Sequence, residues 1–572
     1  MPVDVQQQLA LYDQLVGQRA PFDTVAQQLA DVMFPLGNDI QRLTAPGASR
    51  TFQLYDTTAM ICAERLAGYL YALVTNFHTA WFQFNMGSLQ LDQAGEAWLD
   101  QCRQILQEEM TADDSPVPQS VQDLFQQYVI FATGCHFVDE QPLVSPTLGF
   151  RGFTSQALPW STYVIKESVT HRVDTVYRSF TLTTRQALQQ WGIEALDPSM
   201  QDAARDSSNQ RRLEQPCEFV HGVYPRTDRD PERDDDRAQM PFASVYLDRT
   251  HKHLVDEGGY RTFPYQVLRW GKPNLDTPWG WGRGHMALPE ALTLNSIDQD
   301  ALLALRMHIR PPVWVLGAGR ETVGRVSLRP GAINPIATGA SVQWLTPGGN
   351  FDVQQLSVQE RRERIKQIFF LDILQTIPPL DVRPRGNVTA FEIAQRIRIT
   401  AQILGPAFMR LLHEFLNPFI DTTFSLLLHA RVFPDPPDSI LEAAAANQGR
   451  IDVEYEGPLA RATQAEDVEA IDESIQLGLT IGQGTGDLGI LDNLDLDAAF
   501  RRRAEVRGLP MHLLRDPRQV VALRQQRQQA AAQQAQHQQM LDQAKAAGQV
   551  APALDAMQQM GMNGASANGA AA

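Results

Sequence analysis

The sequence predicts an α+β protein in which helices predominate. Three observations support this fold class. Apolar residues recur at helical spacing near both ends of the 572-residue chain. Between residues 131 and 270 the pattern changes to short alternating or β-branched runs, which are typical of an antiparallel sheet. Apolar residues make up 43 % of the chain and charged residues 20 %, an ordinary balance for globular domains.

Charge and cysteine content exclude several classes of protein. The formal net charge is 49 − 66 = −17, so the chain lacks the basic character of a nucleic-acid clamp. Its four cysteines form no CxxC pair, which argues against a zinc knuckle or a disulfide framework. The polar N-terminus and the longest uncharged stretch, residues 66–91, do not resemble a signal peptide or a membrane span. We therefore expect an intracellular protein with no metal, no cofactor and no membrane insertion.

The first 110 residues are expected to be mostly helical, with a short strand at the aromatic run 81–84. Strands are then expected over residues 131–140, 162–169, 173–182, 217–225 and 243–248, with a short helix at 186–191. The charged segment 225–237 has no aliphatic or aromatic side chain. It is interpreted as an exposed loop between two strands.

A pair of helices is expected in the second half of the chain. Pro289 suits the first position of a helix that ends before Pro311. A second helix is expected to begin at Ser357, because Ser357 and Glu360 have the spacing of a capping box. The compact segment between these helices predicts a hairpin that projects from a body. Cations over residues 361–366 are interpreted as a solvated face or as partners for acids on a neighbouring subunit.

A proline-rich loop, residues 375–388, separates this hairpin from a third helix. Thr389 and Glu392 form its capping box, and the pair Gly405 and Pro406 is expected to kink or break it. The helical pattern then resumes. A strand is expected over 451–457, and more helix over 462–477 and from Asp495 onward. The chain becomes rich in Gln and Ala, and its end is predicted to be disordered.

No catalytic residue can be assigned from sequence motifs. The chain contains no P-loop, no HExxH and no GxSxG pattern. Residues 484–489 match GxGxxG, but they follow a helical pattern where a dinucleotide site needs a strand, which favours a loop. The tryptophans Trp270, Trp279 and Trp281 could stack on sugars or bases, although aromatic packing at a domain joint is favoured.

Four stretches carry a resemblance to a known family. The first runs from residue 387 to 420 and contains T-A-F-E at Thr389 to Glu392, then Gly405 and Pro406, then Glu414 four residues before Pro418. The others are residues 453–462, 280–315 and 63–84. The four stretches, their order along the chain and the length of the chain resemble those of the portal (head-to-tail connecting) proteins of T7-like, short-tailed bacteriophages.

The resemblance implies the phage portal fold, assembled as a ring of twelve copies around a central channel at one capsid vertex. Its parts carry over by position: wing 1–285, stem helices 286–309 and 357–374, clip 310–356, channel loop 375–388, long kinked helix and return to the wing 389–462, crown 463–515, and tail 516–572. Trp314 and Trp344 would flank the clip. Arg383 and Arg385 would form a ring of positive charge in the channel loop.

The resemblance also implies the partners of such a ring. Double-stranded DNA would pass through the channel without sequence recognition. The large terminase subunit and then a tail adaptor or tail tube protein would dock on the clip, and the major capsid and scaffolding proteins would surround the ring. Assembly would take place in the host cytoplasm. The packaging ATPase is a separate subunit in this family, which agrees with the missing P-loop, so no enzymatic activity is expected.

Two other classes of function stay open at this point. One is a hydrolase that uses an Asp/Glu pair in the α+β half, because such pairs are often invisible in sequence. The other is a different virion scaffold protein built on a helical bundle. Size in solution separates the first class from a ring, which would be many times heavier than the 63.9 kDa chain.

Overall fold

The structure is a computed structural model of the full chain. It describes residues 3–37, 39–42, 51, 54–77, 79–86, 91–141, 150–205, 210–227, 229, 237–274, 276–310, 313–316, 329, 332, 341–344, 351–374, 405–446, 451–455, 471–481, 483–484, 489, 493–506, 519–534 and 539. The chain divides into two compact units, Met1–Ala470 and Ile471–Ala572. The first unit combines helices with antiparallel sheets, so the predicted α+β class is confirmed.

The N-terminal quarter is helical, as the sequence predicts. It contains α1 (Val5–Met33), the 3-10 turn η1 (Pro35–Gly37), α2 (Thr58–Val74), α3 (Gln93–Thr111) and α4 (Val117–Phe131). Asp4 caps α1, where its side chain accepts hydrogen bonds from the amides of Gln6 and Gln7. The sequence patterns do not predict α4, because Pro118 resembles a break. Pro118 lies in the first turn of α4, where its missing N–H leaves no hydrogen bond unmade.

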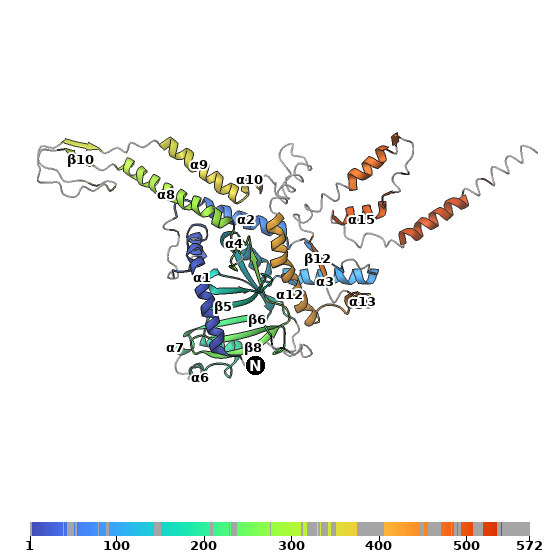
Figure 1. The fold of residues 1–572 in the computed structure, drawn as a ribbon, viewed down its shortest axis with the longest axis horizontal. Helices are drawn as coiled ribbons and strands as arrows, with labels where there is room; N and C mark the ends of the chain where they lie inside the picture. Colours follow the sequence, from blue (N-terminus) through green and yellow to red (C-terminus); the bar gives the residue numbers. More distant parts are fainter. Residues whose placement is uncertain are drawn as a thin grey trace, which may run out of the picture. The chain divides into compact units, whose positions relative to one another are not determined.

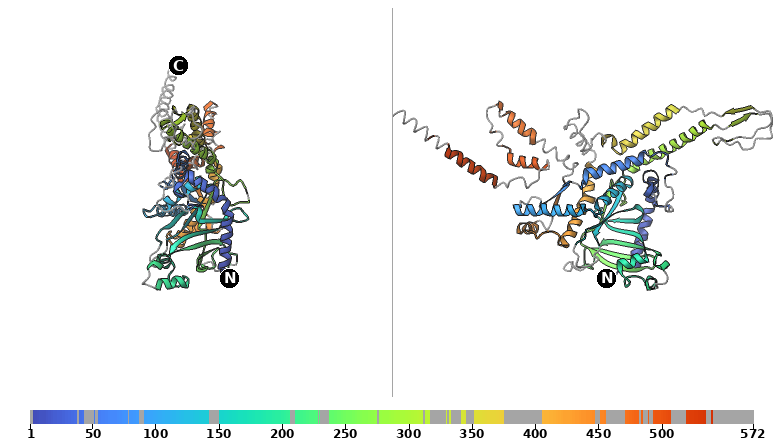
Figure 2. Two further views of the ribbon diagram at one scale, coloured as in Figure 1. Left: turned by 90° about the vertical axis from the view of Figure 1, so that its left-hand side faces the viewer. Right: turned by 180° about the vertical axis from the view of Figure 1, so that it is seen from behind.

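Two antiparallel sheets form the α+β part (Figures 1 and 2). The larger has the order β4-β5-β6-β7-β8, with β4 Tyr163–Glu167, β5 Val173–Thr183, β6 Pro216–Pro225, β7 Phe242–Asp248 and β8 His253–Tyr260. The smaller has the order β3-β2-β9, with β2 Thr133–Glu140, β3 Phe153–Leu158 and β9 Tyr265–Arg269. The five strands expected in this region are confirmed. The patterns do not predict β3, in which polar and apolar residues mix.

Helices cover these sheets. Apolar residues of α1 pack on the larger sheet, where Leu9, Tyr12 and Leu15 share a buried cluster with residues of β4 to β7. The connection from β5 to β6 holds α5 (Thr184–Trp191), α6 (Pro198–Arg205) and α7 (Gln210–Leu213), and the turn η2 (Trp160–Thr162) precedes β4. The expected helix at 186–191 is therefore confirmed within α5. Only a few residues of the charged segment 225–237 lie within the described part of the chain.

The expected helical hairpin is present, with different helix starts. It consists of α8 (Arg283–Ile309) and α9 (Phe351–Ile368), which lie side by side, with β10 (Val313–Leu316) paired to β11 (Ser341–Trp344) between them in sequence (Figure 1). The start expected at Pro289 is wrong. The helix begins six residues earlier because Gly284 lets the backbone approach α4, and a Cβ there would lie 2.0 Å from the Ile130 carbonyl oxygen.

The second helix of the hairpin also departs from expectation at both ends. The capping box predicted at Ser357 and Glu360 is wrong, because Ser357 lies inside α9, where a serine costs only about 0.5 kcal/mol of helix propensity. The helix stops at Ile368 and does not run on to residue 374. Phe370 adopts a left-handed backbone with φ of 58°, and the short helix α10 (Leu371–Leu374) follows.

The last part of the first unit returns to the body. Residues 405–411, where the description resumes, are helical; the helix contains a π-helical turn, η4 (Leu412–Leu416), and continues as α12 (Asn417–His429). After α13 (Asp438–Ala446), β12 (Asp452–Tyr455) pairs with β1 (Phe82–Asn85). The strand expected at 451–457 is thus confirmed. The second unit contains helical residues 471–481, α15 (Leu496–Val506) and helical residues 519–534.

Candidate functional site: the hairpin base and the buried arginine network

Ion pairs join α8 and α9 near the base of the hairpin. Arg361 donates to Glu290 at 2.6 Å, and Arg364 lies 3.6 Å from the same carboxylate. Arg362 donates to Asp298 at 3.0 Å and to Asp56 at 2.8 Å. The cations of residues 361–366 therefore pair with acids of their own chain. These three arginines have partners within the chain, and the interpretation that gives them further partners on a neighbouring subunit stays a prediction.

The segment before α2 is held between the two hairpin helices. The side-chain oxygen of Asn295 on α8 accepts hydrogen bonds from the amides of Tyr55 at 2.7 Å and Asp56 at 3.3 Å. The Asp56 carboxylate also accepts from the Thr58 amide at 2.8 Å. The Asp56 carboxylate, which is buried, thus accepts hydrogen bonds from Arg362 and from both the amide and the hydroxyl group of Thr58.

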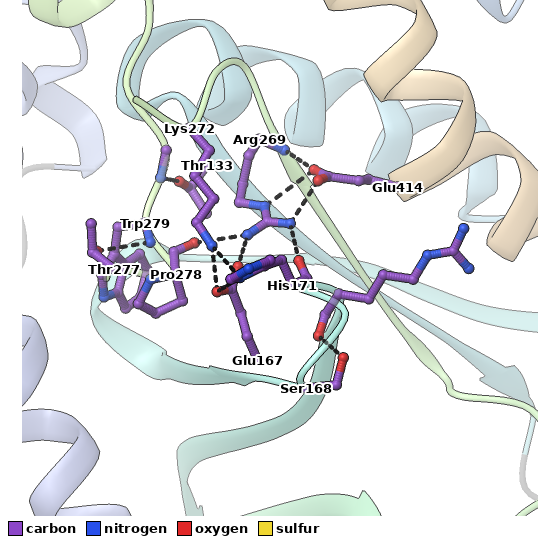
Figure 3. A network of polar contacts seen from close by, with 12 residues as sticks. Thr133, Glu167, Ser168, His171, Arg269, Lys272, Thr277, Pro278, Trp279 and Glu414 are labelled. Atoms are coloured by element: carbon purple, nitrogen blue, oxygen red, sulfur yellow. Dashed lines mark hydrogen bonds and ion pairs between the residues drawn. The ribbon is translucent and has the colours of Figure 1, made fainter. Parts of the chain in front are cut away.

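Arg269, at the end of β9, is the centre of a second polar network (Figure 3). Its side chain is only 2 % exposed. It binds Glu167 of β4, the carbonyl oxygen of Pro278 at 3.3 Å and that of His171 at 3.0 Å. Lys272 pairs with the same Glu167. The network therefore fixes β4, β9 and the chain after β9 relative to one another.

Glu414 connects this network to the helical stretch that is described from Gly405 onward. Its two oxygens accept from the backbone amide of Arg269 at 2.9 Å and from the Nη2 atom at 2.6 Å. Burial opposes the positive charge of Arg269, but the hydrogen bonds and charges of Glu414 and Glu167 raise its pKa above the usual value. With Lys272, two cations then balance two carboxylates, which is the condition for charges to be stable inside a protein.

Apolar contacts surround the same stretch of helix. Phe415 and Phe419 lie 5.7 Å and 5.5 Å from the ring of His136, which is buried in β2. His136 also contacts Ser120, Ser155 and Gln266 through its two ring nitrogens. Burial lowers the pKa of His136 to about 4, so the ring is neutral at physiological pH.

The structure places some of the predicted site residues and not others. Gly405, Pro406, Glu414 and Pro418 lie on one helix, and Glu414 is the one that reaches the buried network. Trp314 and Trp344 lie on paired strands. In the register of this pair, Val313 is opposite Trp344 and Trp314 is opposite Gln343. The remaining four, Arg383, Arg385, Thr389 and Glu392, lie outside the described residues.

Sequence patterns do not predict Arg269 or Glu167 as site residues. The only signal is an arginine at the end of an otherwise apolar strand, since such a charge must find a partner when the strand is buried. The interpretation of the tryptophans as aromatic packing is confirmed for Trp279. Its side chain is buried, and its ring centroid lies 4.6 Å from that of Trp160. Trp270 packs 5.0 Å from Tyr128, whereas Trp281 is half exposed.

The described residues hold no group of three or more His, Cys, Asp or Glu side chains that could bind a metal ion. Among the helices described, none is both long enough and apolar enough to cross a membrane. The candidate site therefore has two features. One is the buried network around Arg269, in which the charges balance, and the other is a hairpin whose outer part exposes apolar surface.

Comparison with known proteins gives a consistent result. The family model of the "Bacteriophage head to tail connecting protein" matches residues 5–514. A "Probable portal protein" of Bordetella phage BPP-1 is 26 % identical over 537 residues, which cover 91 % of this chain and 90 % of that protein. A "Portal protein" of Salmonella phage epsilon15 is 24 % identical, over 90 % of this chain and 89 % of that protein.

Solved structures of gene transfer agent particles are also similar. One is described as the neck of the native particle computed with C12 symmetry; it is 10 % identical and covers 77 % of this chain and 94 % of its own, with a TM-score of 0.29. A chain of the native virion is 12 % identical over 79 % of this chain and 94 % of its own, with a TM-score of 0.28. These scores are too low to support an argument.

Proposed function

Because the chain belongs to the bacteriophage head to tail connecting protein family, we propose that twelve copies form a portal ring at one vertex of the capsid. The family match over residues 5–514 carries this proposal. Membership makes the chain a structural component that connects head and tail in a phage virion. In the proposal, double-stranded DNA enters and leaves the capsid through the central channel of the ring.

The hairpin supports the assignment of the parts. In the proposal α8 and α9 are the stem helices, the segment between them is the clip, and residues 375–388 are the channel loop. The body before α8 is the wing, residues 389–462 are the long kinked helix and the return to the wing, residues 463–515 are the crown, and residues 516–572 are the tail. A helix–strand pair–helix insertion into a body is the arrangement that these assignments require.

Exposed apolar surface on α8 supports assembly. Leu302, Leu305 and Ile309 are more than 40 % exposed, and none of the residues from 295 to 309 is buried. A helix that is apolar on several faces is normally covered. A head-to-tail contact, in which each copy covers its neighbour, closes into a ring when the rotation fits.

Charge supports the role as a DNA conduit. The chain carries a net charge of −17, so an acidic channel would repel phosphates and let the duplex slide. Arg383 and Arg385 would contact phosphates transiently without reading sequence. We propose that the large terminase subunit and later the tail adaptor dock on the clip, with the capsid and scaffolding proteins around the wing. Assembly is proposed to occur in the host cytoplasm.

We assign no catalysis to this chain, because its family consists of structural virion proteins and hydrolysis of ATP would belong to the terminase. The family match gives no support to the hydrolase alternative. Electron micrographs of the purified protein test the proposal directly. Class averages should contain rings with a central hole, and the particle should weigh many times 63.9 kDa. A population of monomers at all protein concentrations would contradict the ring.

The channel loop can be tested in the same particles. Replacing both Arg383 and Arg385 by Ala should leave the rings intact and lower the slope of DNA association against salt concentration. The matched control replaces the exposed pair Arg211 and Arg212 of α7 by Ala, which removes the same charge elsewhere. Equal salt slopes for the two variants would assign the loop arginines to a structural role.

A further inference from the structure

Glu414 and Pro418 are four residues apart on one continuous helical stretch, and this spacing has a physical consequence. In an α-helix the N–H of each residue donates to the carbonyl group four residues before it. Pro418 has no N–H, and its ring would collide with the carbonyl group of Glu414. A regular α-helix is therefore disfavoured at the residue that binds Arg269.

The helix meets this constraint by widening and not by breaking. Leu412–Leu416 form a π-helical turn, in which the amide of Asn417 reaches back five residues to the carbonyl oxygen of Leu412. Asn417 itself keeps right-handed helical angles, with φ of −60° and ψ of −53°. After the turn the regular helix continues as α12, in which the hydroxyl group of Thr422 donates to the carbonyl oxygen of Pro418 at 2.7 Å. Single π turns of this kind are frequent at functional positions.

The widened turn faces the body of the protein. Glu414 makes three hydrogen bonds to Arg269, through the backbone amide, Nη2 and Nε at 2.9, 2.6 and 3.2 Å. The next residue, Phe415, is fully buried and packs with Phe419 beside His136. The turn thus brings a carboxylate and an aromatic ring to two neighbouring partners in β9 and β2.

We propose that Pro418 is a positioning residue, which disfavours the α-helical alternative and so holds the π turn that presents Glu414 to Arg269. The turn also sets the rotation of the preceding stretch, residues 405–411, about the helix axis. A change from π to α would rotate that stretch by about 100° and shift it by about 1.5 Å, the step of one residue. This positioning role does not rest on the proposed function.

Thiol labelling can detect the rotation, because the side chains before the turn differ in exposure. Leu411 is 2 % exposed and Met409 is 52 % exposed, while all four native cysteines are buried. We compare Leu411→Cys and Met409→Cys, each alone and combined with Pro418→Ala. The labelling rate at position 411 should rise by roughly tenfold or more with Pro418→Ala, because the rotation turns this position away from the core, while position 409, which is already exposed, should label no faster.

A double-mutant cycle sharpens the test. Glu414→Gln removes the charge that holds the turn, so in the double variant the labelling rate at position 411 should rise by about the product of the two single effects, since both changes shift the same equilibrium between the π and α forms. The control is Pro118→Ala in the first turn of α4, where the proline blocks no internal hydrogen bond. This variant should leave labelling at position 411 unchanged.

The outcomes separate the two proposals. Unchanged labelling at position 411 in Pro418→Ala, alone and with Glu414→Gln, would overturn the role of Pro418. The labelling is measured on the chain itself, so it does not require a ring. If the wild-type chain forms no ring but the labelling behaves as expected, the positioning role stands and the proposed function fails.

Discussion

The two halves of α8 are one continuous helix in two different environments. In the first half, Ala287, Leu288 and Leu294 are buried against the body. In the second half, from Asn295 to Ile309, no residue is buried, although the sequence there is as apolar as before. Apolar composition therefore does not distinguish a core contact within the chain from a surface that another copy would cover.

Polar contacts differ between the two regions in the same way. Arg269 in the body is almost completely buried and binds two carboxylates, whereas Arg362 on the hairpin is about one third exposed. Removing water from a charge raises both the cost of leaving it unpaired and the strength of its pairing. Substitutions in the body should therefore cost more than similar substitutions on the hairpin.

The largest effect is expected from Arg269→Ala. This change leaves the carboxylates of Glu167 and Glu414 without their main partner, and the free energy of unfolding should fall by about 3–5 kcal/mol. Urea unfolding followed by circular dichroism measures it. Arg185→Ala, which breaks an exposed pair with Glu214, is the control and should change stability by less than about 1 kcal/mol. Equal losses in the two variants would show that burial of the network is not important.

The second prediction compares the two halves of α8 directly. Leu294→Ala should lower the free energy of unfolding by about 2–5 kcal/mol, because it leaves a cavity in the core. Leu302→Ala should change the stability of the single chain by about 0.5 kcal/mol or less. The same Leu302→Ala change should weaken ring assembly, measured by sedimentation. An intact assembly equilibrium would mean that this face of α8 is not covered by a neighbour.

The third prediction concerns pH. Burial lowers the pKa of His136 to about 4, while an unfolded histidine titrates near about 6.5. Below pH 6.5 the unfolded chain takes up a proton that the folded chain does not, so stability should fall by about 1.4 kcal/mol per pH unit down to about pH 4. Above pH 6.5 this group should have no effect.

His136→Gln should remove this contribution from the slope of stability against pH. His221 and His285, whose pKa values burial lowers to about 3 and about 4, would still contribute to the slope. Comparing the two proteins across pH 4.5 to 7.5 separates titration from packing, because any packing cost is the same at every pH. Parallel curves for the two proteins would rule out the assigned titration of His136.

A much smaller effect than that of Arg269→Ala is expected from Arg362→Ala at the hairpin base. Its pairs with Asp56 and Asp298 are partly solvated, so their loss should cost at most about 1 kcal/mol. Asp56 keeps the hydrogen bond from the Thr58 amide, which limits the cost further. Thermal unfolding at low and high salt measures this, and a loss as large as that of Arg269→Ala would contradict the distinction between the two regions.

Much of the fold could be predicted from periodicity, because long amphipathic helices and alternating strands have strong local signals. The starts of α8 and α9 could not. Pro289 and Ser357 have the local chemistry of helix starts, but the true start of α8 depends on how closely Gly284 packs on α4. That contact joins residues far apart in sequence, so no local pattern contains it.

Less of the site could be predicted. Glu414 and Pro418 follow from the family resemblance, but Arg269, the partner of Glu414, lies 145 residues away and has no motif of its own. The cations of residues 361–366 have a visible pattern, yet the pattern does not say whether their acids belong to the same chain. The assignments of Trp314, Trp344, Arg383 and Arg385 stay predictions.

The pairing of β1 with β12 has a consequence for the order of events during synthesis. Asn85 of β1 and Glu454 of β12, which meet across this pair, are 369 residues apart. A ribosome adds roughly 5–20 residues per second, so β1 waits on the order of 20–70 s for its partner. The whole hairpin is made during this interval. The apolar rings of Phe82 and Phe84, buried in the finished protein, therefore lack this partner strand throughout that interval, which makes them a surface for a chaperone to protect while the chain emerges.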